Sequence, residues 1–150
     1  MTLEVNKGIA RRYIAAYSDL TGATSAALLG DDARIQLMMR SRGLPLKTEM
    51  TKTEYLGLFP AMAALLPNGI RHDVVSMIAE GDWVAVETEC FAELQLGGSY
   101  NNLFHFLLKI CDQKVVVVHE YTDFLHTKEA LFDRPTELPT PVKAAHAVDL

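Results

Sequence analysis

Apolar residues in the first part of the chain recur at helical spacing. Between Asn6 and Leu20 they fall on one face of a helix, which predicts an amphipathic helix there. Glycine, proline and other turn residues separate the segments that follow. The expected elements are a short helix over 24–29 capped by Thr24 or Ser25, a strand over 33–39, a loop over 41–47, and a helix that begins at Thr51 or Thr53, is kinked at Pro60 and ends before Pro67.

The remainder of the chain carries strand signals. Long apolar or alternating segments over 73–80, 83–96, 99–110 and 114–125 predict four strands, separated by turn residues such as the pair Gly97 and Gly98. A short helix over 127–132 is expected to follow. Helices first and a meander of long antiparallel strands afterwards indicate an α+β fold, in which helices cover one face of a curved sheet.

The length and composition suit one domain. The chain has 150 residues, of which 49% are hydrophobic. We expect a single domain over 1–132 and a loosely held, proline-containing tail over 133–150. No apolar run approaches the roughly 20 residues of a membrane-spanning helix. The first residues contain no apolar signal-peptide stretch, so a cytoplasmic protein without a membrane partner is expected.

The charged residues are unevenly distributed along the chain. The net charge is −5, and no cluster of Lys and Arg occurs, which argues against a nucleic-acid partner. Fourteen of the 19 acidic residues, but only six of the 14 basic residues, lie in residues 53–150. Carboxylates therefore accompany the predicted strands. Neither Cys90 nor Cys111 has the spacing of a metal site, and both are expected to be buried free thiols.

Four segments carry a resemblance to a known superfamily. With the order of the elements, they are similar to the nuclear transport factor two-like superfamily, which includes ketosteroid isomerases, SnoaL-like polyketide cyclases and limonene-epoxide hydrolases. The resemblance covers about residues 6–132. The segments are ARRYIAAY, GDDARI, GSYNNLFHFLLKI and KVVVVHEYTDFL.

The resemblance implies a fold, a class of ligand and a mode of dimerisation. The fold is a cone-shaped, cystatin-like one, with the N-terminal helices packed in a strongly curved antiparallel sheet that encloses a pocket. The implied ligand is a small hydrophobic molecule, bound without a cofactor. Members commonly form homodimers through the open face of the sheet, where Thr88, Cys90, His105 and His119 would then lie.

Three glutamates are the candidate catalytic residues. Glu87 and Glu89 share one side of their strand with Phe91, because side chains two apart point the same way. The resemblance implies that this side faces the pocket, and that Glu120 matches the acidic residue that serves as base or acid. Carboxylates that converge in a partly apolar pocket raise the pKa of at least one of them, so that two can share a proton. Alternatively, Glu87 and Glu89 face solvent or a dimer interface.

The known sites of the superfamily are incomplete in this chain. The resemblance places Glu87 where the hydrolases carry a cation, and it places Ile35 and Leu37 where they carry water-binding side chains. Of the parts of a ketosteroid isomerase site, Tyr13 alone has its match. Neither known mechanism is therefore expected. Arg71 or His72 either turns inward as the missing cation or stays in solvent at the start of its strand.

The expected lining of the pocket is mainly apolar. Asn102 either donates a hydrogen bond to a substrate carbonyl or stabilises the adjacent turn. His and Glu residues do not share a face at ligand spacing, so no metal site is expected. The candidate substrate-binding residues are Tyr13, Tyr17, Leu37, Leu58, Met62, Phe91, Asn102, Phe104 and Thr122.

Two functions fit the sequence. One is a cofactor-independent enzyme of the isomerase, cyclase or hydrolase kind, with Glu120 as general base and Glu89 as its proton-sharing partner. The other is a non-catalytic module that binds a small molecule or associates through its sheet. In that case each pocket carboxylate would be paired with a fixed cation such as Arg71 or Arg34.

Overall fold

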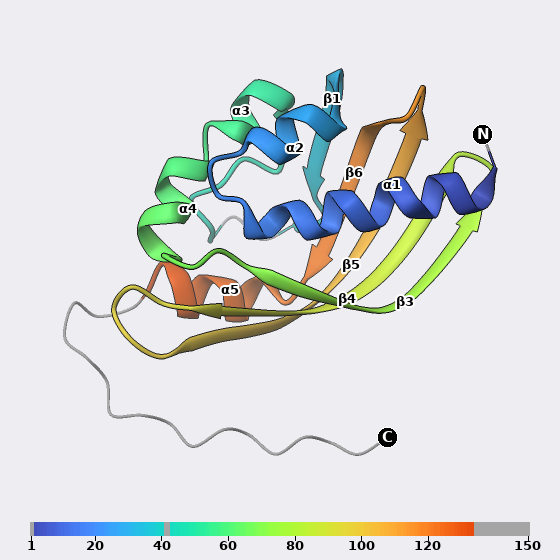
Figure 1. The fold of residues 1–150 in the computed structure, drawn as a ribbon. Coiled ribbons are helices and arrows are strands. Elements are labelled where there is room, and N and C mark those ends of the chain that lie inside the picture. The colour runs from blue at the N-terminus through green and yellow to red at the C-terminus, as the bar shows by residue number, and fades with distance from the viewer. Residues whose placement is uncertain (1, 41–42, 134–150) are drawn as a thin grey trace.

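A computed structural model describes residues 2–40 and 43–133. Helices and strands follow one another in an α+β arrangement (Figure 1). The expected tail over 133–150 lies, from residue 134 on, outside the described residues. The elements are α1 (Leu3–Ala15), η1 (Ala16–Ser18), α2 (Ala23–Leu28), β1 (Leu29–Leu37), β2 (Glu49–Thr51), α3 (Lys52–Leu56), α4 (Phe59–Leu65), β3 (Arg71–Glu80), β4 (Trp83–Glu93), β5 (Ser99–Cys111), β6 (Lys114–Thr122) and α5 (Phe124–Leu131).

The strands form a six-stranded sheet in the order β2-β1-β6-β5-β4-β3. Strands β3 to β6 make the expected antiparallel meander. The sheet as a whole is mixed, because β6 returns beside β1 in the parallel direction. The expectation of a wholly antiparallel sheet is therefore wrong at this pair. This pairing matters for the site, since it sets Leu37 of β1 opposite Glu120 of β6.

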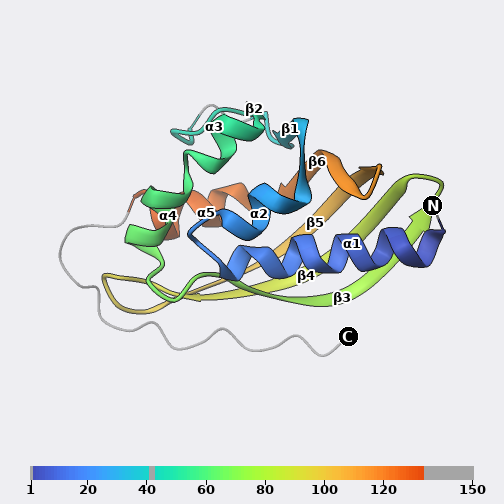
Figure 2. The ribbon, with the colours of Figure 1, turned by 45° about the horizontal axis from the view of Figure 1, so that its top comes forward.

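The helices lie against the concave face of the sheet. Helix α1 runs along this face, and the long strands bend around it (Figure 1). Helices α4 and α5 gather at the end of the sheet away from the N-terminus of α1 (Figure 2). The buried side chains Ile9, Tyr13 and Ile14 of α1 join the inner face of the sheet in one core. None of the helices among residues 2–40 and 43–133 has the length and apolar character needed to cross a bilayer.

Local sequence signals explain where the helices begin. Thr2 caps α1 by accepting a hydrogen bond from Val5 N, so this helix starts before Asn6. Thr51 and Glu54 form a capping box that starts α3. The expected kinked helix is instead two helices, α3 and α4. Pro60 lies at the N-terminus of α4, where its missing N–H removes no helical bond.

The boundaries of β1 and β4 differ from expectation. Strand β1 begins at Leu29, directly after α2, and β4 ends at Glu93. The tight turn before β6 is the expected one. Asp112 and Gln113 both have positive φ, at 48° and 63°, as the central residues of a type I′ hairpin turn require.

Gly69 brings the start of β3 against η1. Its φ is 74°, and a Cβ at this position would lie 2.5 Å from the backbone oxygen of Ser18. Ile70 N donates a hydrogen bond to Tyr17 O at 3.3 Å in the same region. A residue without a side chain is thus needed here. The close approach holds the backbone of Tyr17 beside β3.

Candidate functional site

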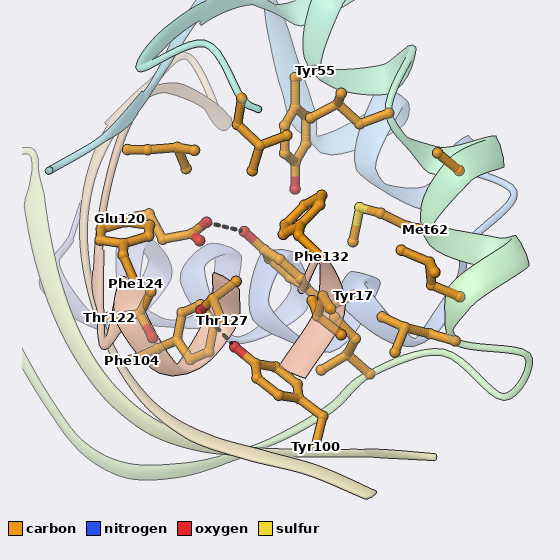
Figure 3. A pocket seen from close by; sticks show the side chains of 18 of the residues that line it. Tyr17, Tyr55, Met62, Tyr100, Phe104, Glu120, Thr122, Phe124, Thr127 and Phe132 are labelled. Carbon is orange, nitrogen blue, oxygen red and sulfur yellow. Dashed lines mark hydrogen bonds between the residues drawn. The ribbon is translucent and has the colours of Figure 1, made fainter. Parts of the chain in front are cut away.

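A cavity of about 160 Å³ lies between the inner face of the sheet and the helices α3, α4 and α5. Its wall is almost wholly apolar, and the polar groups are one carboxyl, three tyrosine hydroxyls and two threonines (Figure 3). No Lys, Arg or His is among the described residues that line it. The lining residues are Tyr17, Leu37, Leu46, Met50, Tyr55, Leu58, Ala61, Met62, Leu65, Leu66, Ile70, Tyr100, Phe104, Glu120, Thr122, Phe124, Thr127, Leu131 and Phe132.

Glu120 supplies the carboxyl group. Strand β6 points its side chain inward, on the same side as Val118 and Thr122, so it enters the cavity from the sheet. The hydroxyl of Tyr17 donates a hydrogen bond to Glu120 Oε2 at 3.1 Å. Burial raises the pKa of Glu120 from its ordinary 4.5 to about 7, against the lowering effect of the Tyr17 hydrogen bond. Near neutral pH this carboxyl can therefore both accept and donate a proton.

Two further tyrosine hydroxyls lie near this carboxyl group. The pKa of Tyr55 is raised to about 12 by burial and then by the charge of Glu120. The pKa of Tyr13 is raised well above its usual value, mainly by burial and next by Tyr55. Both side chains thus keep their proton at neutral pH. Neither hydroxyl has a hydrogen-bond partner among the described residues.

His72 turns inward from β3 but does not supply a cation. Its ring packs edge-on against Tyr17, with ring centroids 4.9 Å apart. Its Nδ1 is 2.9 Å from Thr88 Oγ1, while its buried Nε2 has no partner among the described residues. Burial lowers the pKa of His72 to about 4, although Asp73 acts in the opposite direction. The imidazole is therefore neutral at pH 7.

Arg71 does not supply the missing cation either. Its guanidinium lies over the ring of Phe91, 4.7 Å from the centroid, and it pairs with Asp73 at the exposed start of β3. Of the two alternatives for this residue, the solvated strand end is the one found.

The expectation that Glu87, Glu89 and Phe91 face the pocket is wrong. These three residues do share one side of β4, but the buried side is the other one, which carries Thr88 and Cys90. The side chains that alternate with these three are the buried ones, because they include Val84 and Val86, which pack against α1 and β5. On the outer face, Glu87 accepts a hydrogen bond from Ser76, and Glu89 accepts one from Asn101. Glu89 therefore cannot share a proton with Glu120.

The alternation of side chains along the strands also corrects which residues lie on the expected dimer face. Thr88 and Cys90 lie on the inner face and are fully buried. His105 and His119 lie on the outer face, as expected from their strand positions. Both cysteines are free thiols; Cys90 is buried as expected, whereas the expectation of burial is wrong for Cys111, which is exposed. Residues 2–40 and 43–133 contain no group of three or more His, Cys, Asp and Glu that could hold a metal ion.

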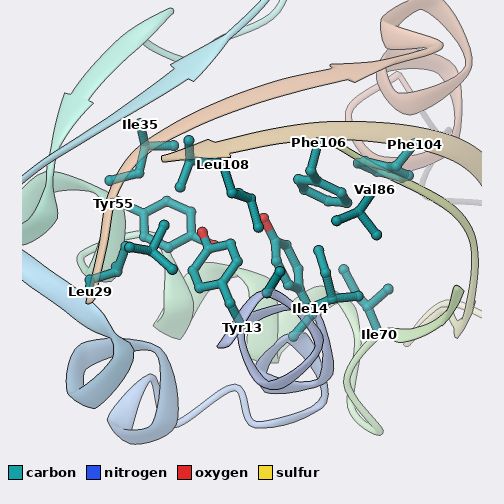
Figure 4. Packing of buried hydrophobic residues seen from close by; sticks show 14 of the residues in the cluster. Tyr13, Ile14, Leu29, Ile35, Tyr55, Ile70, Val86, Phe104, Phe106 and Leu108 are labelled. Carbon is teal, nitrogen blue, oxygen red and sulfur yellow. The ribbon is translucent and has the colours of Figure 1, made fainter. Parts of the chain in front are cut away.

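Tyr13 and Asn102 are buried beside the cavity without lining it. Figure 4 shows Tyr13 within the core. Its ring centroid is 5.9 Å from that of Tyr17. Asn102 Nδ2 donates to the hydroxyl of Tyr100 at 2.8 Å, to Asp123 O at 3.1 Å and to Thr127 Oγ1 at 3.2 Å. These bonds tie α5 to β5. Asn102 thus holds a wall of the cavity in place and has no donor directed into it.

Seven of the expected residues come together in the cavity. Several lining residues were missed by sequence reasoning, notably Tyr55, Tyr100 and Thr127. The sequence pattern could have identified Tyr55 as a lining residue, because it precedes the expected lining residues Leu58 and Met62 at helical spacing. Tyr100 and Thr127 lie on separate elements and had no such pattern. The seven are Tyr17, Leu37, Leu58, Met62, Phe104, Glu120 and Thr122.

No family model and no curated protein matches the sequence. The structure is similar to solved structures of low sequence identity. PrhC from Penicillium brasilianum NBRC 6234 aligns with a TM-score of 0.76 and 17% identity, over 87% of each chain. An LEH-like epoxide hydrolase of M. tuberculosis aligns with a TM-score of 0.68 and 14% identity, over 87% of this chain and 92% of that one.

A third neighbour belongs to the nuclear transport factor two-like group. This protein of unknown function from Burkholderia pseudomallei aligns with a TM-score of 0.72 and 15% identity, over 88% of this chain and 99% of that one. The chain therefore has the nuclear transport factor two-like fold, as its element order predicts.

Proposed function

We propose that this protein is a cofactor-independent enzyme of the SnoaL-like type, in which Glu120 transfers protons to and from an apolar small molecule with one polar group. The observation that carries the proposal is a carboxyl group with a pKa of about 7 inside an apolar cavity. A general acid or base works best when its pKa lies near the working pH. An epoxide hydrolase is among the proteins of similar structure, which supports an enzymatic role.

The proposed cycle uses the two forms of one side chain. Ionised Glu120 accepts a proton from a carbon of the substrate or from a water molecule beside it. The resulting carboxylic acid then returns that proton to another atom of the substrate, so that the enzyme ends unchanged. Tyr17 keeps the carboxyl oriented through its hydrogen bond to Oε2 at 3.1 Å. The apolar wall excludes bulk water and strengthens each of these electrostatic interactions.

Two simple probes test general acid–base catalysis without knowledge of the natural substrate. Cyclohexanone in D₂O reports removal of a proton next to a carbonyl, and cyclohexene oxide reports hydrolysis; both are followed by NMR. We expect the protein to accelerate at least one reaction, and Glu120→Gln to reduce that acceleration at least a hundredfold. Glu87→Gln is the matched control, because Glu87 lies on the outer face of β4. If neither probe reacts, or if Glu120→Gln retains full activity, the proposal is overturned.

A homodimer through the outer face of the sheet is proposed as well. Large apolar side chains on this face are open to solvent: Ile78 of β3 is 71% exposed, Leu103 of β5 66% and Tyr121 of β6 40%. Exposed apolar patches of this kind are typical of association surfaces. The same association is also what a non-catalytic interaction module would use.

Sedimentation equilibrium tests the dimer with two equally exposed leucines. Leu103→Asp places a charge on the outer face and is expected to give monomers. Leu125→Asp is the control, because Leu125 is also 66% exposed but lies on α5. A monomeric parent protein, or a Leu103→Asp variant that still dimerises, would contradict the proposal.

A further inference from the structure

Tyr55 places a hydroxyl without a partner in the cavity. Its side chain is 5% exposed, and its hydroxyl has no hydrogen-bond partner among the described residues. Figure 3 shows this hydroxyl directed into the cavity from the side opposite the sheet. The ring is held in place by an edge contact with Phe59, with centroids 5.4 Å apart. The capping box of Thr51 and Glu54 fixes the helix that carries it.

A buried hydroxyl in this position calls for an acceptor. Burying a polar group without a hydrogen bond is unfavourable, and nearly all such groups in proteins are paired. Phenylalanine would fill the same space without that cost. The hydroxyl of Tyr13 is also buried without a hydrogen-bond partner among the described residues, so the two hydroxyls do not satisfy one another in this structure. Since the phenol keeps its proton at neutral pH, what is missing is an oxygen or nitrogen that accepts a hydrogen bond.

The charge and size of the cavity limit which molecule brings that acceptor. Glu120 is the one acidic or basic side chain among the described residues of the lining. A second negative charge would be repelled in this low-dielectric space, so an anion is disfavoured. The cavity of about 160 Å³ is close in size to apolar cavities that accept benzene. An uncharged molecule of about one ring fits these limits.

We propose that Tyr55 donates a hydrogen bond to a carbonyl or ether oxygen of an uncharged, ring-sized ligand. This inference rests on the proposed function, because it names the substrate class and the residue that orients it toward Glu120. The hydroxyl of Tyr17 already donates to Glu120, so the hydroxyls of Tyr17 and Tyr55 have different roles. Tyr17 positions the carboxyl group, and Tyr55 binds the oxygen of the substrate.

Binding of matched probes, measured by NMR titration at pH 8, tests this inference. Cyclohexanone and methylenecyclohexane have the same shape and differ in the acceptor oxygen; cyclohexanecarboxylate and cyclohexylamine add a negative or a positive charge. We expect cyclohexanone to bind most tightly and cyclohexanecarboxylate most weakly. Tyr55→Phe should weaken cyclohexanone binding about tenfold and leave methylenecyclohexane within about twofold. Tyr121→Phe, on the outer face, should change neither.

The outcomes separate this inference from the proposed function. If Tyr55→Phe binds cyclohexanone as the parent does, or if the carboxylate or the amine binds most tightly, the inference is overturned, whatever the activity. If Glu120→Gln keeps both its cyclohexanone affinity and its turnover, the proposed function fails while the role of Tyr55 stands. Loss of methylenecyclohexane binding in Tyr55→Phe would indicate a collapsed cavity and would also count against the inference.

Discussion

Burial and one hydrogen bond act on Glu120 in opposite directions. Removal from water favours the neutral carboxylic acid, whereas the hydroxyl of Tyr17 favours the carboxylate. Burial is the larger effect, so the pKa stays near 7. His72, neutral beside Tyr17, adds no positive charge to reverse this balance. The state of Glu120 therefore depends directly on the contact with Tyr17.

Tyr17→Phe should raise the pKa of Glu120 above 7. The substitution removes the hydrogen bond that stabilises the carboxylate and leaves the burial unchanged. A ¹³C NMR titration of the glutamate carboxyl groups measures this shift. Tyr121→Phe, on the outer face of β6, serves as the control and should leave the titration as it is. A Glu120 midpoint that falls in Tyr17→Phe would show that the hydroxyl does not act as a donor to it.

Glu120 should also make the stability of the protein depend on pH. The pKa of Glu120 is about 7 in the folded protein, compared with the ordinary value of 4.5 that applies to the unfolded chain. Between these two pH values the folded state therefore binds more protons than the unfolded state. The free energy of unfolding should consequently fall as the pH rises from about 4.5 through about 7, by on the order of 3 kcal/mol. Urea unfolding at pH 5 and pH 8 measures the difference. Glu120→Gln should remove this part of the pH dependence and Glu87→Gln should retain it; equal slopes in both variants would contradict the assignment.

At the scale of elements, the approach of β3 to η1 sets the position of Tyr17. Gly69 has a positive φ and no room for a side chain, since Ser18 O would lie 2.5 Å from a Cβ. Gly69→Ala should therefore lower the free energy of unfolding by on the order of 2 kcal/mol, as measured by urea denaturation. Gly8→Ala is the matched control in α1, where a Cβ meets nothing within 4 Å. That control should stabilise the protein by about 0.5–1 kcal/mol, and similar effects from both substitutions would argue against the close approach.

Strand β4 shows where sequence reasoning about elements succeeds and where it ends. Alternation alone identifies which side chains share a side, and that grouping is found in the structure. The composition of the two sides already indicates which one is buried, because the inner side carries Val84, Val86 and Ala92 whereas the outer side carries three glutamates. The resemblance implied that the other side faces the pocket, and Glu87 and Glu89 were therefore wrongly expected to line it. On β6, Val118 marks the buried side, and Glu120 is correctly placed with it.

For the whole molecule, the order of elements predicted an α+β fold with helices on one face of a curved sheet, and the resemblance implied its cone shape. Helices followed by a meander of strands have few ways to bury one apolar face, and a helix-filled curved sheet is one of them. The cavity was harder to predict, because its wall combines β1, β2, β5, β6, η1, α3, α4 and α5. Contacts between such distant segments, for example Asn102 with Thr127, leave no periodic signal in the sequence.

The whole-molecule view also changes the meaning of the acidic composition. Glu87 and Glu89 lie on the outer face, where they accept hydrogen bonds from the neighbouring polar side chains of Ser76 and Asn101. Among the described residues that line the cavity, Glu120 alone is acidic. The proposed chemistry thus depends on one isolated carboxyl group and does not require a cluster of them.

The central claim is that Glu120 exchanges protons with a bound substrate near neutral pH. The pH dependence of the probe reaction that the parent protein accelerates, compared between the parent protein and Glu120→Gln, measures this exchange. The rate due to the parent protein should rise with pH, with a midpoint near the Glu120 pKa of about 7, and the rise should be absent in Glu120→Gln. A rate that does not depend on pH in this range, or a rise that persists in Glu120→Gln, would contradict the account.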